Sequence, residues 1–420
     1  MRNLLLFVLL FCYTFAFYIG EFSISLLMAV PLYGYGMVDR GYKHDLLTVF
    51  NNHYIKRVFK SWWILTVLSL FFPALFLTFD LSLFRVVIMQ FFHLLATIPV
   101  FAYLKNKRYT NEQVLTMFVL IFVVQTIIQC IVVSNETLGE WILYFNHFQP
   151  EKVLGAGSNI RGKALSAATT YHLSLVYGVG FIIYIKEFLS QKISLLNVLI
   201  GILIFVGIFF AGRTGFVGVI IGLIAFGLSK EIGIFRKIKF VCLLLLLLLV
   251  MVVLLSIVMP EFYLFLEEQV FPYAFEFIYS MDKSGQMETA STNHLKEMWN
   301  REFDYIEFLI GSGKYSNEDG SYYMHVDPGI LRHLLFMGIG GYLFLIVYQL
   351  VLLPFWKMNK KTCFYYGLIL IYFFIMDFKG CTIGVNKFAF SASLLLSFSY
   401  FELTPKTDFH KRLDKHHYLL

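Results

Sequence analysis

The chain has 420 residues, of which 59% are hydrophobic and only 15% are charged. Soluble globular domains carry about 25% charged residues, so this composition excludes an ordinary soluble protein. The net charge of +7 does not indicate nucleic-acid binding, because most of the excess lies beside apolar runs, where membrane proteins collect Lys and Arg on one side.

Apolar runs of about 17 to 25 residues recur along the whole chain, and each is long enough to cross a bilayer core of about 30 Å. Backbone amides in lipid must be satisfied within their own segment, so these runs are predicted to be helices. The sequence therefore predicts an all-α polytopic membrane protein with about twelve transmembrane helices. The predicted spans are residues 3–20, 22–38, 61–79, 84–104, 113–133, 166–185, 194–211, 214–229, 239–259, 330–353, 363–377 and 384–401.

The first apolar run, Leu4 to Ile19, follows Arg2 and is similar in layout to a secretion signal. Residues 15–17 place bulky side chains where a signal peptidase needs small ones, so an uncleaved first span is predicted. The boundary between the first two spans at Gly20 and Glu21 is the weakest, because one bent segment can replace both.

Placing the N-terminus in the cytoplasm puts most of the 34 Lys and Arg residues on inner segments, as the positive-inside rule requires. The C-terminus is then cytoplasmic as well. The basic tail, residues 402–420, is interpreted as an anchor to anionic lipid. Membrane lipids are therefore expected partners, and nucleic acid is not.

Two outer segments are too long to be simple connectors, residues 134–165 and 260–329. A loop as long as the second is usually functional or a small domain. It contains two stretches with apolar residues at helical spacing, Glu261 to Phe277 and Thr292 to Phe308. The predicted organisation is nine membrane helices within 1–259, a large periplasmic loop with short helices at 260–329, three membrane helices within 330–401, and the basic tail.

Three groups of basic residues lie on the outer side, against the positive-inside bias. Arg161 and Lys163 end the first outer loop, Arg213 lies in the Gly212–Gly215 turn, and Arg332 follows the large loop. Guanidinium groups suit a bidentate grip on phosphate oxygens. An arginine at this depth is costly unless it is paired or faces a wet cavity. These residues are therefore candidate ligands for a membrane-held phosphate.

Each of these residues also has a purely structural interpretation. Arg213 can snorkel from its helix end to lipid headgroups. Arg161, with Lys163 beside it, fits a general interfacial anchor. Arg332 can form an ion pair with Asp327 five residues earlier.

Three further candidates stand near the same outer segments. His325 closes the large loop, where a histidine is more often solvated than catalytic. Lys379 and Lys387 flank the last outer turn, where they are phosphate contacts or interfacial anchors, with anchors favoured. The five cysteines have no C-x-x-C spacing, so neither a disulfide framework nor a cysteine zinc site is implied, and no metal or cofactor is expected.

The combined layout resembles a known family. It consists of long outer loops, a Gly-Arg-Thr-Gly motif that opens a span, and the run from Asp327 to Gly341, Asp-Pro-Gly-Ile-Leu-Arg-x5-Gly-x-Gly-Gly. These features resemble the Wzy-type O-antigen polymerases, and the related O-antigen ligases share the plan. The resemblance implies a GT-C-like architecture in the bacterial inner membrane, with a periplasmic active site.

The family's implied reaction is glycosyl transfer without a metal. The growing glycan leaves undecaprenyl diphosphate and joins the non-reducing end of the next lipid-linked repeat unit. By this similarity Arg161 and Arg213 would hold the diphosphate and stabilise its developing charge. His325 or Asp327 would be the base for the acceptor hydroxyl, and Arg332 would contact phosphate or orient Asp327. The implied partners are lipid-linked glycans and a chain-length regulator of the polysaccharide co-polymerase type.

Two alternatives remain beside the polymerase. An O-antigen ligase has the same layout, and the ligases' catalytic histidine has its nearest match in His325. A flippase for lipid-linked oligosaccharides belongs to a different class. Flippases tend to have short loops and two matching halves, which the unequal halves of this chain do not show.

Overall fold

The computed structural model describes residues 2–146, 162–168, 170–230, 232–258, 260–265, 267–268 and 290–404. This part of the chain is almost entirely helical, with one two-stranded antiparallel sheet formed by β1 (Tyr18–Ile19) and β2 (Phe22–Ser23). The helices are α1 (Arg2–Phe15), α2 (Ile24–Val38), α3 (Arg40–Phe50), α4 (His53–Leu75), α5 (Ser82–Asn106), α6 (Asn111–Ser134), α7 (Glu136–Asn146), α8 (Thr170–Tyr184), α9 (Leu195–Ala211), α10 (Phe216–Leu228), α11 (Ile234–Val258), α12 (Pro260–Phe265), α15 (Ala290–Trp299), α16 (Tyr305–Ile310), α17 (Gly329–Leu352), α18 (Lys360–Asp377) and α19 (Lys387–Leu403).

Each of the twelve predicted spans overlaps one of these helices. Within the described residues, five helical segments are long and apolar enough to cross a membrane: 53–75, 82–106, 111–134, 170–189 and 329–357. Four shorter apolar helices accompany them, at residues 2–15, 24–38, 195–211 and 213–228. The protein is therefore an all-α membrane protein, and the number of twelve crossings stays a prediction.

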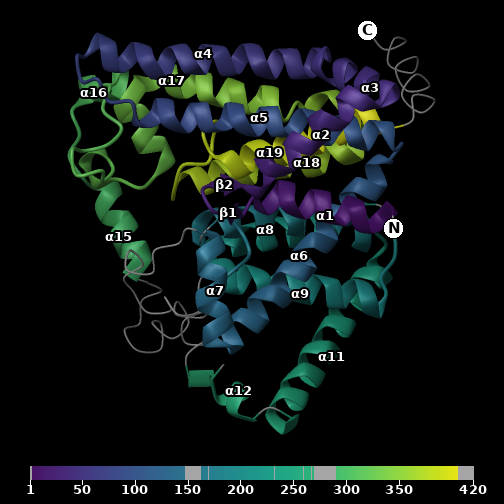
Figure 1. The fold of residues 1–420 in the computed structure, drawn as a ribbon. Coiled ribbons are helices and arrows are strands. Elements are labelled where there is room, and N and C mark those ends of the chain that lie inside the picture. Colours follow the sequence, from purple (N-terminus) through teal and green to yellow (C-terminus); the bar gives the residue numbers. More distant parts are fainter. Residues whose placement is uncertain are drawn as a thin grey trace.

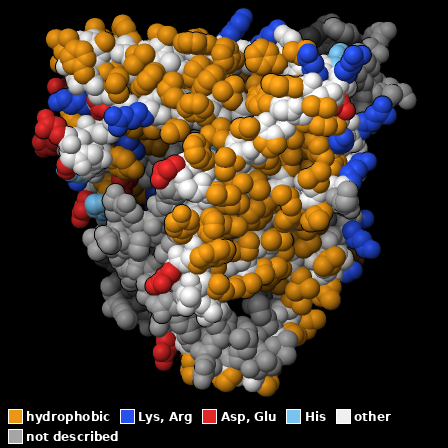
Figure 2. Space-filling model, in the orientation of Figure 1, with side chains coloured by type: hydrophobic (Ala, Val, Ile, Leu, Met, Phe, Trp, Pro, Cys, Tyr) orange, Lys and Arg blue, Asp and Glu red, His pale blue; other side chains and the backbone are white. Residues whose placement is uncertain are grey.

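Most of the long helices lie roughly along one common direction, with α11 as an exception that runs at a steep angle to them, so the bundle has two ends (Figure 1). We call one the loop end; it holds the β1–β2 hairpin, α7, α15, α16 and the connections at 76–81, 162–168, 212–215, 311–328 and 378–386. The other is the basic end, with the N-terminus, α3 and the connections at 107–110, 190–194 and 353–359. Figure 2 shows hydrophobic side chains across the face between the two ends, while most Lys and Arg gather at the edge near α3 and the N-terminus. This is the distribution expected of a bundle that lies in a bilayer.

Small residues allow the central helices to approach closely. A Cβ added to Gly218 of α10 would lie 2.5 Å from the Cα of Gly178 of α8, so neither glycine has room for a side chain. Membrane helices use such contacts because lipid supplies little hydrophobic drive for association, and packing must replace it. The close pair fixes α10, and the turn before it, against α8.

The structure has a break between the first two predicted spans. Helix α1 ends at Phe15, and the chain reverses through the hairpin, in which Tyr18 pairs with Ser23 and Ile19 with Phe22. Ala16 and Gly20 both have left-handed φ values, 46° and 57°, which the reversal requires. Two separate helices therefore replace the single bent segment that the sequence left open.

The large loop differs from its prediction at one point. The stretch from Thr292 to Phe308, with its helical spacing of apolar residues, is only partly helical, because the chain forms α15 and α16 with a break at 300–304. Asp304 causes the restart, since its carboxylate accepts a hydrogen bond from the backbone N of Ile306, 2.9 Å away, as an N-cap. The other predicted stretch, Glu261 to Phe277, lies largely outside the described residues, as does the tail from Pro405.

The described part of the large loop is fastened to the turn between α4 and α5. The carboxylate of Asp80 accepts hydrogen bonds from the backbone N of Tyr315 at 2.6 Å, of Ser316 at 2.7 Å and of Ser82 at 2.8 Å. Thr78 donates its hydroxyl to the carbonyl of Gly313 at 2.7 Å. Burial would raise the pKa of Asp80, but the hydrogen bonds to its carboxylate, from the side chain of Ser82 and from the three backbone N–H groups, outweigh it and lower the pKa below its ordinary value.

Candidate functional site

Arg332 lies in the first turn of α17, at the loop end, and is only 8% exposed. Its guanidinium carbon is 4.1 Å from the ring centroid of Tyr315 and 3.5 Å from that of Tyr322. Nη1 donates to the sulfur of Cys381 at 3.3 Å, and Nε has no partner among the described residues. Aromatic faces attract a guanidinium most strongly when it is shielded from water. The charge of Arg332 is therefore held by two rings and a thiol.

The predicted alternative of an Arg332–Asp327 ion pair does not form in the structure. No such pair lies within 4.0 Å among the described residues, and Asp327 is exposed, with its backbone N donating to the sulfur of Met298. Burial raises the pKa of the Cys381 thiol. The positive charge of Arg332 acts in the opposite direction, but its effect is smaller, so the pKa stays above its ordinary value. The thiol is thus a neutral acceptor, and Arg332 keeps its full positive charge.

A turn at residues 378–386, between α18 and α19, lies at the centre of the loop end. Asp377, fully buried, accepts hydrogen bonds from the backbone N of Thr382 at 2.7 Å and of Ile383 at 3.1 Å. Its other oxygen accepts one from the hydroxyl of Tyr342 at 3.1 Å. A Cβ at Gly329 would collide with this carboxylate and lie 2.8 Å from the Cα of Cys381. The Asp-Pro-Gly motif therefore requires glycine because α17 begins against this turn.

The N-terminal turn of α8 is tied to the same place. The hydroxyl of Tyr171 lies 2.7 Å from the carbonyl of Met376, 2.9 Å from that of Gly380 and 2.5 Å from the hydroxyl of Thr382. One turn further, the hydroxyl of Ser174 lies 2.7 Å from that of Thr214. The start of α8 therefore connects the 378–386 turn to the turn that carries Arg213.

Arg213 and its flanking glycines form a short 3-10 turn between α9 and α10, and the arginine is partly exposed. Gly215 has no room for a side chain, because a Cβ there would lie 2.8 Å from Ile208 and 3.0 Å from the carbonyl oxygen of Ser174. The Gly-Arg-Thr-Gly motif thus presses the turn against α8 and α9. Arg213, the one large polar residue of the motif, therefore lies at the loop end.

Lys379 and Lys387, at the turn between α18 and α19, are partly exposed. Lys387 begins α19, and its Nζ lies 3.5 Å from the hydroxyl of Tyr18 and 4.9 Å from the ring centroid of Phe388. Lys379 lies within the 378–386 turn itself. The structure therefore brings Lys379, Lys387 and Arg332 to one turn, with Arg213 joined to it through α8.

The remaining predicted residues lie further out or cannot be placed. Lys163 belongs to residues 162–168, which cross the ends of α9 and α1 through backbone bonds from Gly162 to Phe210 and from Ala167 to Phe15. Its Nζ lies 3.3 Å from the position of a Cβ on Gly139 in α7. Arg161 lies outside the described residues.

His325 is exposed on the large loop and has a left-handed φ of 52°, next to Met324 with 53°. Such a backbone is strained for residues other than glycine. Arg301 holds it, donating from Nη1 to the carbonyl of Met324 and, at 3.5 Å, to that of His325. The left-handed backbone at these two residues sets the direction in which the chain continues to Asp327.

Sequence reasoning missed the partners that hold these cations. Tyr315, Tyr322 and Cys381 carry no motif, and the chain has 26 tyrosines from which to choose. Asp377 did carry a signal, because an acidic residue at the edge of an apolar run is costly unless it has partners. The described residues contain no group of three or more His, Cys, Asp or Glu side chains placed to hold a metal ion.

Comparison with known proteins identifies no similar protein. The chain matches no family model, no curated protein and no solved structure.

Proposed function

We propose that the chain is a Wzy-type polysaccharide polymerase whose active site is the loop end. The observation that carries the proposal is the cation cluster around residues 378–386. Arg332 and Lys387 are held there by aromatic rings, a hydroxyl and a thiol, and no described carboxylate lies within ion-pair distance of either. Such a cluster beside an apolar bundle suits a dianionic substrate that is anchored in the membrane.

The reaction would be a glycosyl transfer from undecaprenyl diphosphate. The acceptor hydroxyl oxygen forms a bond to the anomeric carbon, while the bond from that carbon to the phosphate oxygen breaks. The diphosphate leaves with the electron pair, and the hydroxyl proton passes to a base, for which His325 and Asp327 remain the candidates. Fixed cations beside the leaving diphosphate stabilise the charge that develops on it.

The cations divide into two roles by their exposure. Arg213, Lys379 and Lys387 are partly exposed, and we assign them the phosphate contacts, together with Lys163 and Arg161 from the preceding loop. Arg332 is only 8% exposed, and its guanidinium carbon lies within 4.1 Å of the centroids of two tyrosine rings. We therefore assign Arg332 a positioning role, in which it holds the large loop against the 378–386 turn.

A place for the isoprenoid chain supports the same end of the bundle. An apolar groove of about 540 Å³ lies between α4, α16 and α17, and Phe72, Met337 and Gly341 line it. Leu309 and Ile310 of α16 form its rim, with 41% and 51% exposure. Along α17 the groove residues, Met337 to Phe344, lie about one and a half to three turns from Arg332. An undecaprenyl chain in this groove would have its diphosphate near the loop end.

The proposed topology has twelve spans, both termini in the cytoplasm and the loop end in the periplasm of the inner membrane. The support is the concentration of Lys and Arg at the basic end, as the positive-inside rule expects. A chain-length regulator of the co-polymerase type would then contact the protein on the periplasmic side or within the bilayer.

The test is a lipopolysaccharide gel from a strain that lacks this chain. A ladder that collapses to core plus one repeat unit supports the polymerase, because units are still exported and ligated but not joined. Bare core with polymer accumulating on its lipid carrier in the periplasm would identify a ligase instead. Bare core with single repeats trapped in the cytoplasm would identify a flippase. An unchanged ladder would remove the chain from this pathway.

A further inference from the structure

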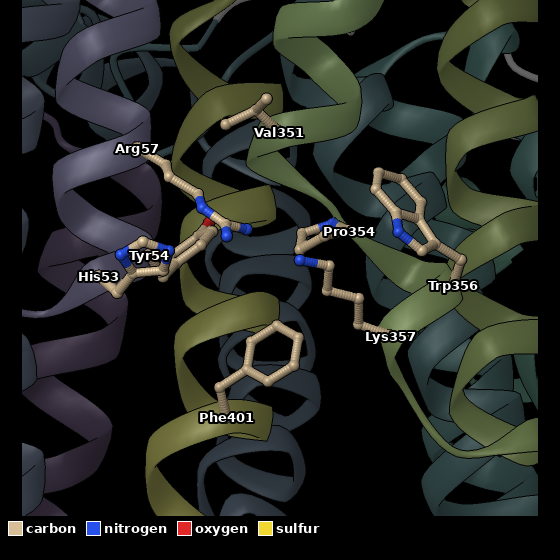
Figure 3. A pocket seen from close by; sticks show the side chains of 8 residues that line it. All are labelled: His53, Tyr54, Arg57, Val351, Pro354, Trp356, Lys357 and Phe401. Atoms are coloured by element: carbon tan, nitrogen blue, oxygen red, sulfur yellow. The ribbon is translucent and has the colours of Figure 1, made fainter. Parts of the chain in front are cut away.

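A second site lies at the basic end, far along the helices from the cation cluster. It is a cavity of about 200 Å³ between α4, α19 and the segment that follows α17. Figure 3 shows Arg57 reaching in from α4 and Lys357 from the opposite wall, with their charged ends pointing towards one another. Phe401 of α19 and Trp356 complete the walls.

The charges in this cavity are not balanced by any carboxylate of the described part of the chain. Among the described residues, no carboxylate lies within 4.0 Å of Arg57 or Lys357. Glu402, which follows Phe401, is already engaged, because it forms an ion pair with Lys105 at 3.3 Å and accepts a hydrogen bond from the side chain of Asn52 at 2.5 Å. Two facing cations repel each other, and an anion between them removes that cost.

The walls of the cavity are apolar and well fixed. Tyr54 donates its hydroxyl to the carbonyl of Leu352 at 2.7 Å, which ties α4 to the end of α17. Ser397 of α19 donates to the same carbonyl at 2.8 Å. Trp356 is 51% exposed beside the cavity, as interfacial tryptophans of membrane proteins are. The cavity is thus a rigid notch at the edge of the apolar belt.

We propose that this cavity, the Arg57–Lys357 notch, binds the phosphate of an anionic phospholipid headgroup such as phosphatidylglycerol. Guanidinium and ammonium groups recognise phosphate oxygens, and basic pockets between membrane helices on the cytoplasmic side recognise lipid headgroups. A volume of about 200 Å³ is below the roughly 300–1,000 Å³ of drug-sized ligand sites. It therefore fits a headgroup, with the acyl chains outside along the apolar surface.

This proposal does not depend on the polymerase function. It requires that the protein resides in a membrane with its basic end on the cytoplasmic side, and its residues are separate from those placed at the loop end. An anionic lipid in the notch would bridge α4, α19 and the α17–α18 connection at the level of the headgroups.

The experiment titrates dioleoylphosphatidylglycerol into the purified full-length protein in detergent and counts bound lipids by native mass spectrometry. Replacing both cations with alanine (R57A/K357A) should weaken binding roughly 30-fold, because each cation near a lipid phosphate contributes about fivefold. The matched control removes two exposed cations of the same end, Arg236 and Lys239 of α11 (R236A/K239A), and should change binding by less than about twofold. The single variants R57Q and K357Q, each expected to lose about fivefold, serve if the double variant does not fold.

Three results would overturn the proposal. Equal losses in both double variants would mean that only the overall charge of the basic end matters. Equal binding of phosphatidylcholine would mean that the notch does not read the anionic charge. Binding of soluble glycerol phosphate as tight as that of the lipid would identify a free phosphate ester as the ligand. Preferential binding of phosphatidylglycerol, lost only in the notch variants, supports it.

Discussion

The two ends of the bundle hold arginine in opposite ways. At the loop end Arg332 is 8% exposed, and its guanidinium carbon lies 4.1 Å and 3.5 Å from the ring centroids of Tyr315 and Tyr322. At the basic end Arg57 is exposed and points across an open cavity towards Lys357. An arginine thus connects two segments of the chain at the loop end, whereas at the basic end an arginine is available to bind a ligand. The availability of its polar edges decides between these roles.

This contrast also bears on the proposed active site. The sequence predicts a phosphate contact for each of the outer arginines and lysines, with an interfacial anchor as the alternative for most of them and an ion pair with Asp327 as the alternative for Arg332. The structure separates them, since Arg332 is enclosed while Arg213, Lys379 and Lys387 keep part of their surface open.

The largest expected effect is qualitative and tests whether the two ends lie on opposite sides of the membrane. Cysteines introduced at Asn300, on the loop end, and at Lys230, near the basic end, are both at exposed positions. In spheroplasts, which lack the outer membrane, an impermeant maleimide should label Asn300→Cys fully. It should label Lys230→Cys only after the inner membrane is permeabilised. Peptide mass spectrometry distinguishes the new thiols from the five native cysteines. Labelling of position 230 with protection of position 300 would invert the topology.

The next effect concerns the open cation of the loop end. Arg213→Ala should lower glycan extension by roughly 100-fold or more, because one fixed charge beside the leaving diphosphate is lost. Arg213→Lys should recover little of it if the grip is bidentate. The read-out is the length of the ladder on a lipopolysaccharide gel, with the protein level in the membrane measured by immunoblot.

The matched control for this test is Arg85→Ala. Arg85 is an exposed arginine of the same end, near the start of α5, and it has no place in the cation cluster. Its variant should extend glycan almost normally. Normal extension by Arg213→Ala, or equal loss in both variants, would remove the specific role of Arg213.

The sequence predicts the helices well because a membrane span needs only length and apolarity, which are local properties. It also places Arg213 correctly in its turn, since the flanking glycines mark a close approach that local sequence can reveal. It misses the break at 300–304, because the apolar spacing continues through it, although Asp304 offered a capping signal.

The surroundings of Arg332 are beyond such reasoning for a different physical cause. Tyr315 and Tyr322 reach it from the large loop, and Cys381 reaches it from a turn 49 residues further along the chain. These contacts depend on how the segments pack in three dimensions. Nothing in the local sequence distinguishes these tyrosines from the others.

A smaller effect tests the packing that shapes the loop end. Gly329→Ala should destabilise the fold by about 1–3 kcal/mol, because the new methyl group collides with Asp377 and the backbone of Cys381. Gly340→Ala, in the same helix, has nothing within 4 Å of the new methyl group and should be neutral or slightly stabilising. Thermal unfolding of the two purified variants in detergent compares them directly. Equal melting temperatures would show that α17 does not begin against this turn.

The smallest expected effect concerns the fastening of the large loop by Asp80. Its carboxylate accepts three backbone hydrogen bonds, and its pKa is lowered in the folded protein. A lowered folded pKa means that the stabilisation is fully present above the ordinary pKa of 3.8 and is lost as the pH falls through the folded value. Asp80→Asn should cost about 1 kcal/mol at neutral pH, a modest figure because the group is partly solvated. The difference in melting temperature between wild type and variant should shrink as the pH approaches 3.8 and falls below it, whereas a constant difference would mean that the ionised carboxylate does not hold the loop.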